Sequence, residues 1–235
     1  MTSLSSAFRF AALLVSLAAL APRAPAQDAT PQMKTYQMIF LRKAPHPPAG
    51  AAATPELQKA HVDRLLQLSA RRVNLLSGPF LDDTDLRGIV VLDVPDAPSA
   101  LKIFAEDAYV KAGLLLAEVK PWLGPRDGFG RPAEPQELEH LVFGFLMSGP
   151  NRKQSEAEAA EIQMGHLAYM AELHKQGKLV TAGPFLDESD WRGVVIYRVA
   201  TADEAKQLAA GDPAVKAGRL VLDAHPWMTL KGMLP

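Results

Sequence analysis

The chain has 235 residues, of which 48% are hydrophobic and 22% charged, and its formal net charge is −1 at pH 7. This composition is typical of a globular protein, and the lack of a basic excess argues against a nucleic-acid or anionic-membrane partner. There is no cysteine, which excludes disulfides and thiolate chemistry.

The first segment, residues 1–26, predicts a secretory signal peptide. Arg9 supplies a positive charge, and residues 10–21 form an apolar run that is short for a membrane span. Ala24-Pro25-Ala26 then provides a small-x-small cleavage site. An uncleaved membrane anchor is the alternative. A linker at 27–35 follows, and we expect an exported protein, periplasmic or secreted, without membrane contact once the signal is removed.

The first predicted domain, residues 36–123, has the element order β-α-β-β-α-β. Its strands are expected at 36–41, 75–81, 88–94 and 114–119, and its helices at 55–72 and 97–104. Thr54 followed by Pro55 is a typical helix start. The Gly-Pro pair inside the second strand indicates an edge strand or a bulge.

A Gly- and Pro-rich linker, residues 124–140, leads to the second predicted domain, residues 141–230, which repeats the order. Its strands are expected at 141–147, 179–186, 194–199 and 220–224. Ser155 and Thr201 each stand three residues before a glutamate, the pattern of a capping box at a helix start.

The two domains are copies of one unit. Residues 78–88 recur as 183–193 at an offset of 105 positions (183 − 78), and the same offset relates His61 to His166 without a gap. A residue kept in both copies while its neighbours change is kept for a physical reason.

This repeated order predicts an α+β fold. Each copy should form a ferredoxin-like unit with two helices on one face of an antiparallel sheet. Strands such as residues 89–92 are apolar on both faces, so the second face needs another cover. We therefore expect the two sheets to pack against each other as an intramolecular pseudo-dimer, within a monomer.

A histidine lies in the apolar stripe of the first helix of each copy. His61 shares its helix face with Leu57, Leu65 and Leu68, and His166 occupies the equivalent place. A buried imidazole needs a hydrogen-bond partner, and Asp107 and Asp212 are the best candidates. Such a carboxylate would leave the second ring nitrogen free to move a proton. Two alternatives stay open: the aspartates only cap short helical turns, or the histidines are core residues.

The remaining repeated residues suggest weaker hypotheses. Arg87 or Arg192 could hold a substrate carboxylate. Alternatively, Arg87 could organise the hairpin together with Asp82 and Asp85. Trp122 and Trp227 are expected to close their own units by packing. No metal-binding motif and no phosphate loop occurs, so we expect neither metal nor cofactor. The histidines without a counterpart in the other copy are His46, His140, His174 and His225.

Together these motifs resemble the YCII-related domain. The resemblance rests on the helix with its central histidine, Gly-Pro-x-Leu-Asp, Asp-Pro-x-Val-x-Ala-Gly and a last strand ending in Pro-Trp, and it covers about 36–123 and 141–228. It implies a dimeric α+β barrel in which His61 with Asp107, and His166 with Asp212, are active-site residues. Related proteins include a dehydrochlorinase of chlorinated hydroxyquinols, and muconolactone isomerases share the barrel.

The family's Asp-Pro-aromatic turn is divided between the copies. The first copy has Asp107-Ala108-Tyr109 without the proline, and the second has Asp212-Pro213-Ala214 without the aromatic residue. We expect one site to be degenerate, with the second copy slightly better formed.

The predicted function is a cofactor-independent acid/base enzyme, a lyase or isomerase for a small acidic or enolisable molecule. The alternative is a small-ligand-binding or structural module that uses the same fold. A pocket that reaches the free imidazole nitrogen would favour the enzyme.

Overall fold

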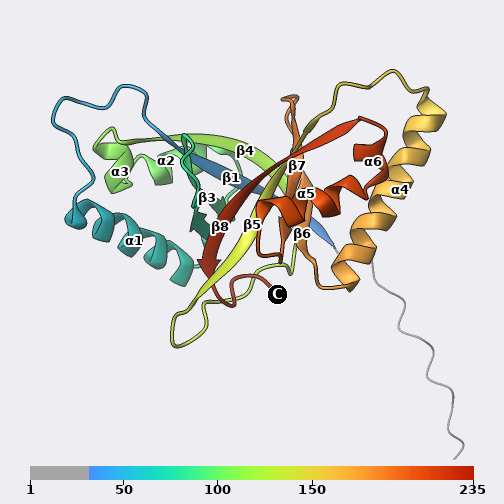
Figure 1. Cartoon of the computed structure of the whole chain (residues 1–235). Coiled ribbons are helices and arrows are strands. Elements are labelled where there is room, and N and C mark those ends of the chain that lie inside the picture. Colours follow the sequence, from blue (N-terminus) through green and yellow to red (C-terminus); the bar gives the residue numbers. More distant parts are fainter. Residues whose placement is uncertain (1–31) are drawn as a thin grey trace, which may run out of the picture. The chain divides into compact units, whose positions relative to one another are not determined.

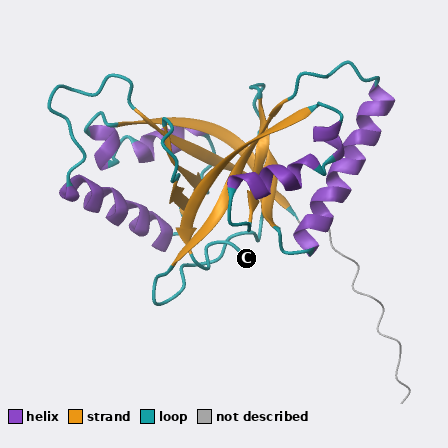
Figure 2. Ribbon diagram, in the orientation of Figure 1, coloured by secondary structure: helices purple, strands orange, loops and turns teal. Residues whose placement is uncertain are grey.

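The computed structural model describes residues 32–235, and the predicted signal peptide lies outside this range. The first copy forms β1 (Met33–Lys43), α1 (Pro55–Ala70), β2 (Asn74–Pro79), β3 (Leu86–Leu92), α2 (Ala97–Phe104), α3 (Ala108–Lys111) and β4 (Leu115–Pro125). The second forms β5 (Leu138–Ser148), α4 (Glu156–Lys175), β6 (Leu179–Pro184), β7 (Trp191–Tyr197), α5 (Ala202–Ala210), α6 (Pro213–Lys216) and β8 (Leu220–Leu230). Figure 1 and Figure 2 show this arrangement.

Each copy contains one four-stranded antiparallel sheet with helices on one face. The strand orders are β2-β3-β1-β4 and β6-β7-β5-β8, which are the same order in both copies. The predicted α+β fold with two ferredoxin-like units is therefore confirmed. The helix starts follow local chemistry: the Thr54 side chain accepts a hydrogen bond from the Leu57 backbone N–H, and Ser155 and Glu158 form the predicted capping box.

The last strand of each copy is longer than the sequence indicated. β4 and β8 continue through Pro121-Trp122 and Pro226-Trp227, whereas the predictions ended at 119 and 224. A proline has no N–H to donate to a strand ladder. Here each proline carbonyl has a partner in the other copy: Leu186 donates to Pro121, and Leu81 to Pro226, both at 2.9 Å.

These contacts join the two sheets along two seams. The β2–β8 seam contains the bridge between Phe80 and Trp227, and the β6–β4 seam contains the bridge between Phe185 and Trp122. The edges of the two sheets thus meet on both sides, as expected for a barrel made from two ferredoxin-like units. The described part of the chain accordingly forms one compact unit.

The repeated Gly-Pro and Pro-Trp motifs belong to these seams. Trp227 donates its indole N–H to the carbonyl of Gly78, and Trp122 donates to Gly183, both at 2.9 Å. A side chain at Gly78 would overlap the backbone carbonyl of Met228. The tryptophans therefore close the contact with the other copy, which corrects the expectation that each closes its own unit.

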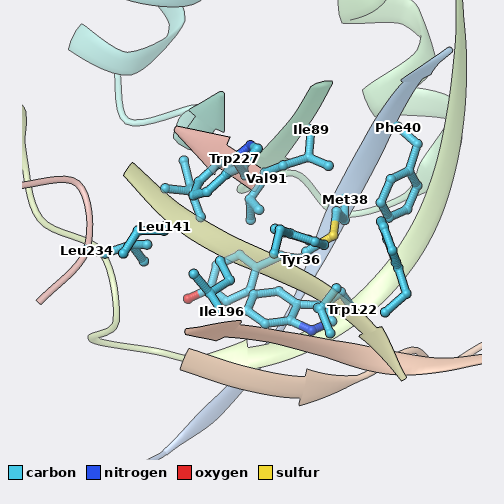
Figure 3. Packing of buried hydrophobic residues seen from close by; sticks show 14 of the residues in the cluster. Tyr36, Met38, Phe40, Ile89, Val91, Trp122, Leu141, Ile196, Trp227 and Leu234 are labelled. Carbon is cyan, nitrogen blue, oxygen red and sulfur yellow. The ribbon is translucent and has the colours of Figure 1, made fainter. Parts of the chain in front are cut away.

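The largest core cluster lies between the two sheets and draws on both copies. Figure 3 shows Trp122 and Trp227 among Tyr36, Met38, Phe40, Leu141 and Ile196. Each copy has one smaller cluster, which lies between its sheet and its own helices. The apolar strands are thus covered on both faces, as the sequence predicted. Within residues 32–235, no helix is long and apolar enough to cross a membrane.

Candidate active site

A histidine–aspartate pair is formed in each copy. His61 Nδ1 lies 2.6 Å from Asp107 Oδ2, and His166 Nδ1 lies 2.6 Å from Asp212 Oδ2. Both carboxylates are buried, with exposures of 1% and 0%. The two pairs that the sequence suggested therefore exist, and their catalytic role remains a prediction.

The same aspartates also cap the short helices. Asp107 Oδ1 accepts hydrogen bonds from the backbone N–H groups of Tyr109 and Val110, at 3.0 and 3.3 Å. Asp212 Oδ1 accepts one from Ala214 at 2.8 Å. Helix capping and pairing with histidine are therefore compatible roles of one aspartate. The Oδ1 atom accepts from the backbone N–H groups, and the Oδ2 atom contacts the imidazole. The backbone donors fix the carboxylate, and the carboxylate fixes the imidazole ring.

The second nitrogen of His61 is left available. Its Nε2 has no hydrogen-bond partner in the part of the chain that the structure describes. In the neutral ring, an N–H at Nδ1 pointing to Asp107 places the acceptor lone pair on Nε2. This is the tautomer required of a general base.

A cavity of about 370 Å³ lies beside His61. Its walls come mainly from α1, β2 and β3 of the first copy and from β8 of the second. Single residues of β1, α3, β4 and β5, and one residue of the linker before β5, complete the lining. Most of its lining side chains are apolar, among them Leu41, Val62, Leu65, Leu138 and Met228. Residues of both copies therefore form this cavity. His61 of the first copy lines it, and His166 of the second does not.

Tyr109 adds a polar group to this cavity. Its ring centroid lies 5.1 Å from that of His61, and it is a lining residue. Burial, together with the negative charge of Asp107, raises the pKa of Tyr109. The phenol is therefore protonated at neutral pH and can donate a hydrogen bond.

The second copy differs around its pair. Ala214 replaces Tyr109, and Tyr197 stands where the first copy has Leu92. The Tyr197 hydroxyl is buried without a hydrogen-bond partner among residues 32–235, and burial raises its pKa, with smaller contributions from Asp212 and Tyr169. His166 does not line the cavity described above. That cavity therefore gives no support to the sequence-based preference for the second copy.

The two predicted substrate-binding arginines occupy different surroundings. Arg87 lines the cavity and makes one long contact, 3.5 Å, with the exposed Asp83. Arg192 is exposed, donates to the Ser148 hydroxyl at 2.8 Å and is not a lining residue. The structure thus brings together His61, Asp107 and Arg87 and separates Arg192 from them.

A further pair of ionic contacts was missed by the sequence analysis. Asp82 Oδ2 lies 2.5 Å from His225 Nδ1, and Asp187 Oδ2 lies 2.7 Å from Lys120 Nζ. Each contact joins the two copies, and position 120 is the counterpart of 225 (225 − 105). The sequence did contain a sign of these contacts. Asp82 and Asp187 are equivalent positions that keep the aspartate, and their partners His225 and Lys120 are equivalent positions that keep a basic residue.

The Asp187 contact also has an electrostatic effect on that carboxyl. Burial by itself would raise the pKa of Asp187, but hydrogen bonds from Lys120 and Ser189 and the charge of Lys120 outweigh it and lower the pKa.

Among residues 32–235, no group of three or more His, Cys, Asp or Glu side chains is arranged to hold a metal ion.

Comparisons with solved structures identify the fold. A heme-binding protein from Thermus thermophilus has a TM-score of 0.52 at 12% identity, covering 85% of this chain and 94% of that one. A candidate monooxygenase from Lactobacillus acidophilus has a TM-score of 0.52 at 12% identity, covering 85% and 96%.

The comparison with protein families is more specific. No curated protein sequence matches the chain. The YCII-related domain, however, matches twice, at residues 38–123 and 144–224, and these two matches contain both histidine–aspartate pairs. The chain therefore belongs to the YCII-related domain family, in the form of a tandem duplication.

Proposed function

We propose that the protein is a cofactor-independent acid/base enzyme and that His61, oriented by Asp107, is its general base. The observation that carries this proposal is the free Nε2 of an aspartate-bound histidine at the wall of a mostly apolar cavity. A general base needs an acceptor nitrogen within reach of a bound molecule, and this arrangement supplies one.

The reaction class that fits is elimination or isomerisation. His61 Nε2 takes a proton from a carbon atom of the substrate, and the negative charge of Asp107 stabilises the imidazolium that forms. In an elimination, the electron pair of the broken C–H bond forms the new double bond as the leaving group departs. In an isomerisation, the imidazolium returns the proton to another carbon. Tyr109, which lines the same cavity, would donate its hydroxyl proton in a hydrogen bond to an oxygen that gains charge.

Arg87 suggests the class of substrate. It is the one lining side chain of this cavity with a permanent positive charge, and its contact with Asp83 is long and exposed. The rest of the lining is mostly apolar or uncharged. We therefore propose an apolar organic anion, with its carboxylate at Arg87 and its reacting carbon at His61.

Arg87→Gln should remove the preference for an anion. We expect the native protein to bind 4-tert-butylbenzoate about tenfold more tightly than its neutral amide, because hydrogen bonds to charged groups contribute about 1.5–3 kcal/mol. Isothermal titration calorimetry with both compounds measures this ratio, which should approach one in Arg87→Gln. Arg192→Gln is the matched control and should keep it. An equal loss in both variants would count against Arg87 as the anion site.

The reaction is tested with 5-nitrobenzisoxazole, a small aromatic compound that opens when a base removes its ring C–H proton. The N–O bond breaks as the proton leaves, giving a nitrile and a coloured phenolate without any cofactor. We expect saturable turnover that 4-tert-butylbenzoate inhibits competitively. Binding of the benzoate without any turnover would instead favour a binding module.

That binding module is the second candidate function. An aspartate-supported histidine with a free Nε2 also has the form of a heme ligand, and the Thermus thermophilus protein of similar fold binds heme. Titration with heme, followed by its absorption spectrum, separates the candidates. A stoichiometric spectral change that His61→Ala abolishes would support binding.

We also propose that the protein is exported after removal of residues 1–26, on the strength of the charged, apolar and small-residue pattern of that segment. N-terminal sequencing of protein from the native host should find Gln27 as the first residue. A first residue of Met1 or Thr2 would contradict export by this route.

A further inference from the structure

Asn74 is a buried amide that joins β2 to α1. Its side chain is 2% exposed, and its Nδ2 donates to the Leu65 carbonyl at 3.2 Å and to the Ser77 hydroxyl oxygen at 3.0 Å. A carbonyl oxygen can only accept, so this contact fixes which end of the amide faces α1. Leu65 lies one helical turn after His61. Asn74 therefore holds Ser77 in place relative to the part of α1 that carries the proposed general base.

Ser77 keeps one unused hydrogen-bond donor. The residue is half-buried and lines the cavity beside His61. Its Oγ accepts from Asn74, and its hydroxyl proton has no acceptor within residues 32–235. The Ser77 backbone carbonyl accepts from the Thr229 hydroxyl at 2.8 Å, which also holds the backbone. What remains is an O–H group at the cavity wall that can donate to a bound molecule.

The second copy lacks this arrangement. At the 105-residue offset, Leu179 stands in place of Asn74 and Ala182 in place of Ser77 (74 + 105 and 77 + 105). Leu179 is buried in the cluster between the second sheet and its helices. The fold therefore accepts an apolar residue at this position.

The asparagine of the first copy is unfavourable for stability in one respect. Its Oδ1 is buried without a hydrogen-bond partner in the described part of the chain, and such an atom destabilises the folded state. A leucine, as in the second copy, avoids this loss. The two copies also differ at the cavity, which His61 lines and His166 does not. We therefore look for the contribution of Asn74 at the cavity.

We propose that Ser77, positioned by Asn74, donates a hydrogen bond to a second oxygen of the bound molecule. This inference rests on the proposed function, in which Arg87 holds a carboxylate. It narrows the ligand class to apolar organic anions that also carry a hydroxyl, ether or carbonyl oxygen. Ser77 determines specificity and Asn74 is a positioning residue. A donor that is already held in place loses little conformational freedom on binding, which favours a ligand with an acceptor at this position.

The sheet sets the spacing of the two polar contacts. Ser77 pairs with Val90 on β3, and Arg87 lies three residues before Val90 (90 − 87). At about 3.3 Å per residue, the two backbone positions are roughly 10 Å apart along the strand. The arginine side chain is long, so one small molecule can contact both groups.

Pairs of ligands with nearly the same shape test the donor. In 3- and 4-hydroxymethylbenzoate a hydroxyl replaces the methyl group of 3- and 4-ethylbenzoate, at two different ring positions. We define the selectivity as the Kd of the ethyl compound divided by that of its hydroxymethyl partner. For at least one pair, the selectivity of the native protein should be about fivefold higher than that of Ser77→Ala. Isothermal titration calorimetry measures it.

The second copy supplies the matched variants. Ser77→Ala copies Ala182, and Ala182→Ser, away from the cavity beside His61, should leave the selectivity unchanged. Asn74→Leu copies Leu179 and should lower the selectivity by a similar factor. It should have no further effect in the Ser77→Ala background, because both residues act through one hydrogen bond. A merely structural role of Asn74 would weaken both members of a pair equally, and an unchanged selectivity in Asn74→Leu would overturn its positioning role.

The outcomes also separate this inference from the proposed function. Equal selectivity in the native protein and Ser77→Ala for both pairs would overturn the role of Ser77. If the ethylbenzoates still bound more tightly than their neutral amides in an Arg87-dependent manner, the anion site would stand. If they showed no such preference, the proposed site would fail, and the role of Ser77 would fail with it. Thermal unfolding checks that each variant is folded at the temperature of the titration.

Discussion

Replacing His61 with alanine is expected to lower kcat/KM for 5-nitrobenzisoxazole by about 10²–10⁴-fold, the usual contribution of a positioned general base. The imidazole is the basic group at the cavity wall, and Asp107 holds it in the tautomer with an acceptor Nε2. Initial rates of phenolate formation measure the loss.

Three variants separate catalysis from folding. His61→Gln keeps a donor for Asp107 but supplies no basic nitrogen, so it should be as inactive as His61→Ala with less loss of stability. Asp107→Asn should lower the rate at least about tenfold by releasing the ring. His166→Ala should leave the rate nearly unchanged, because His166 does not line the cavity. Unchanged turnover in His61→Gln would remove His61 from the mechanism.

Gly78→Ala should have the largest effect on stability. A Cβ there would overlap the carbonyl oxygen of Met228 and press on the Trp227 ring, so β2 and β8 could not keep their separation. We expect a loss of about 3 kcal/mol or more, at the upper end for added volume in a packed region. Thermal unfolding should show a decrease in Tm of roughly 10 °C.

Two other glycines serve as comparisons. Gly183→Ala should cost a similar amount, because its Cβ would overlap the Leu123 carbonyl in the other seam. In Gly50→Ala the added Cβ would meet no heavy atom within 4 Å. Only the positive φ of 80° opposes this change, with an expected loss of stability of about 1–2 kcal/mol. If Gly78→Ala were no worse than Gly50→Ala, the close contact at the β2–β8 seam would be wrong.

The duplication explains why much of the fold could be predicted from the sequence. Helix starts such as Thr54-Pro55 and Ser155 with Glu158 depend on neighbours within one turn, so local chemistry determines them. Hydrophobic periodicity placed His61 and His166 on buried helix faces, and two copies at one offset made Asp107 and Asp212 their most plausible partners. Each histidine lies 2.6 Å from an aspartate of its own copy, so the pair depends on contacts within one repeated unit.

The contacts between the copies were decided by the tertiary structure. Asp82 and His225 are 143 positions apart, and no local pattern relates them. Gly78 is required because β8 of the other copy passes close to it, not because of a local bend. The cavity likewise combines α1 of the first copy with β8 of the second. Hydrophobic periodicity and helix capping are patterns over a few residues, so they can be recognised in the sequence. The seams exist only when the two sheets pack against each other. That packing also forms the cavity beside the aspartate-bound His61.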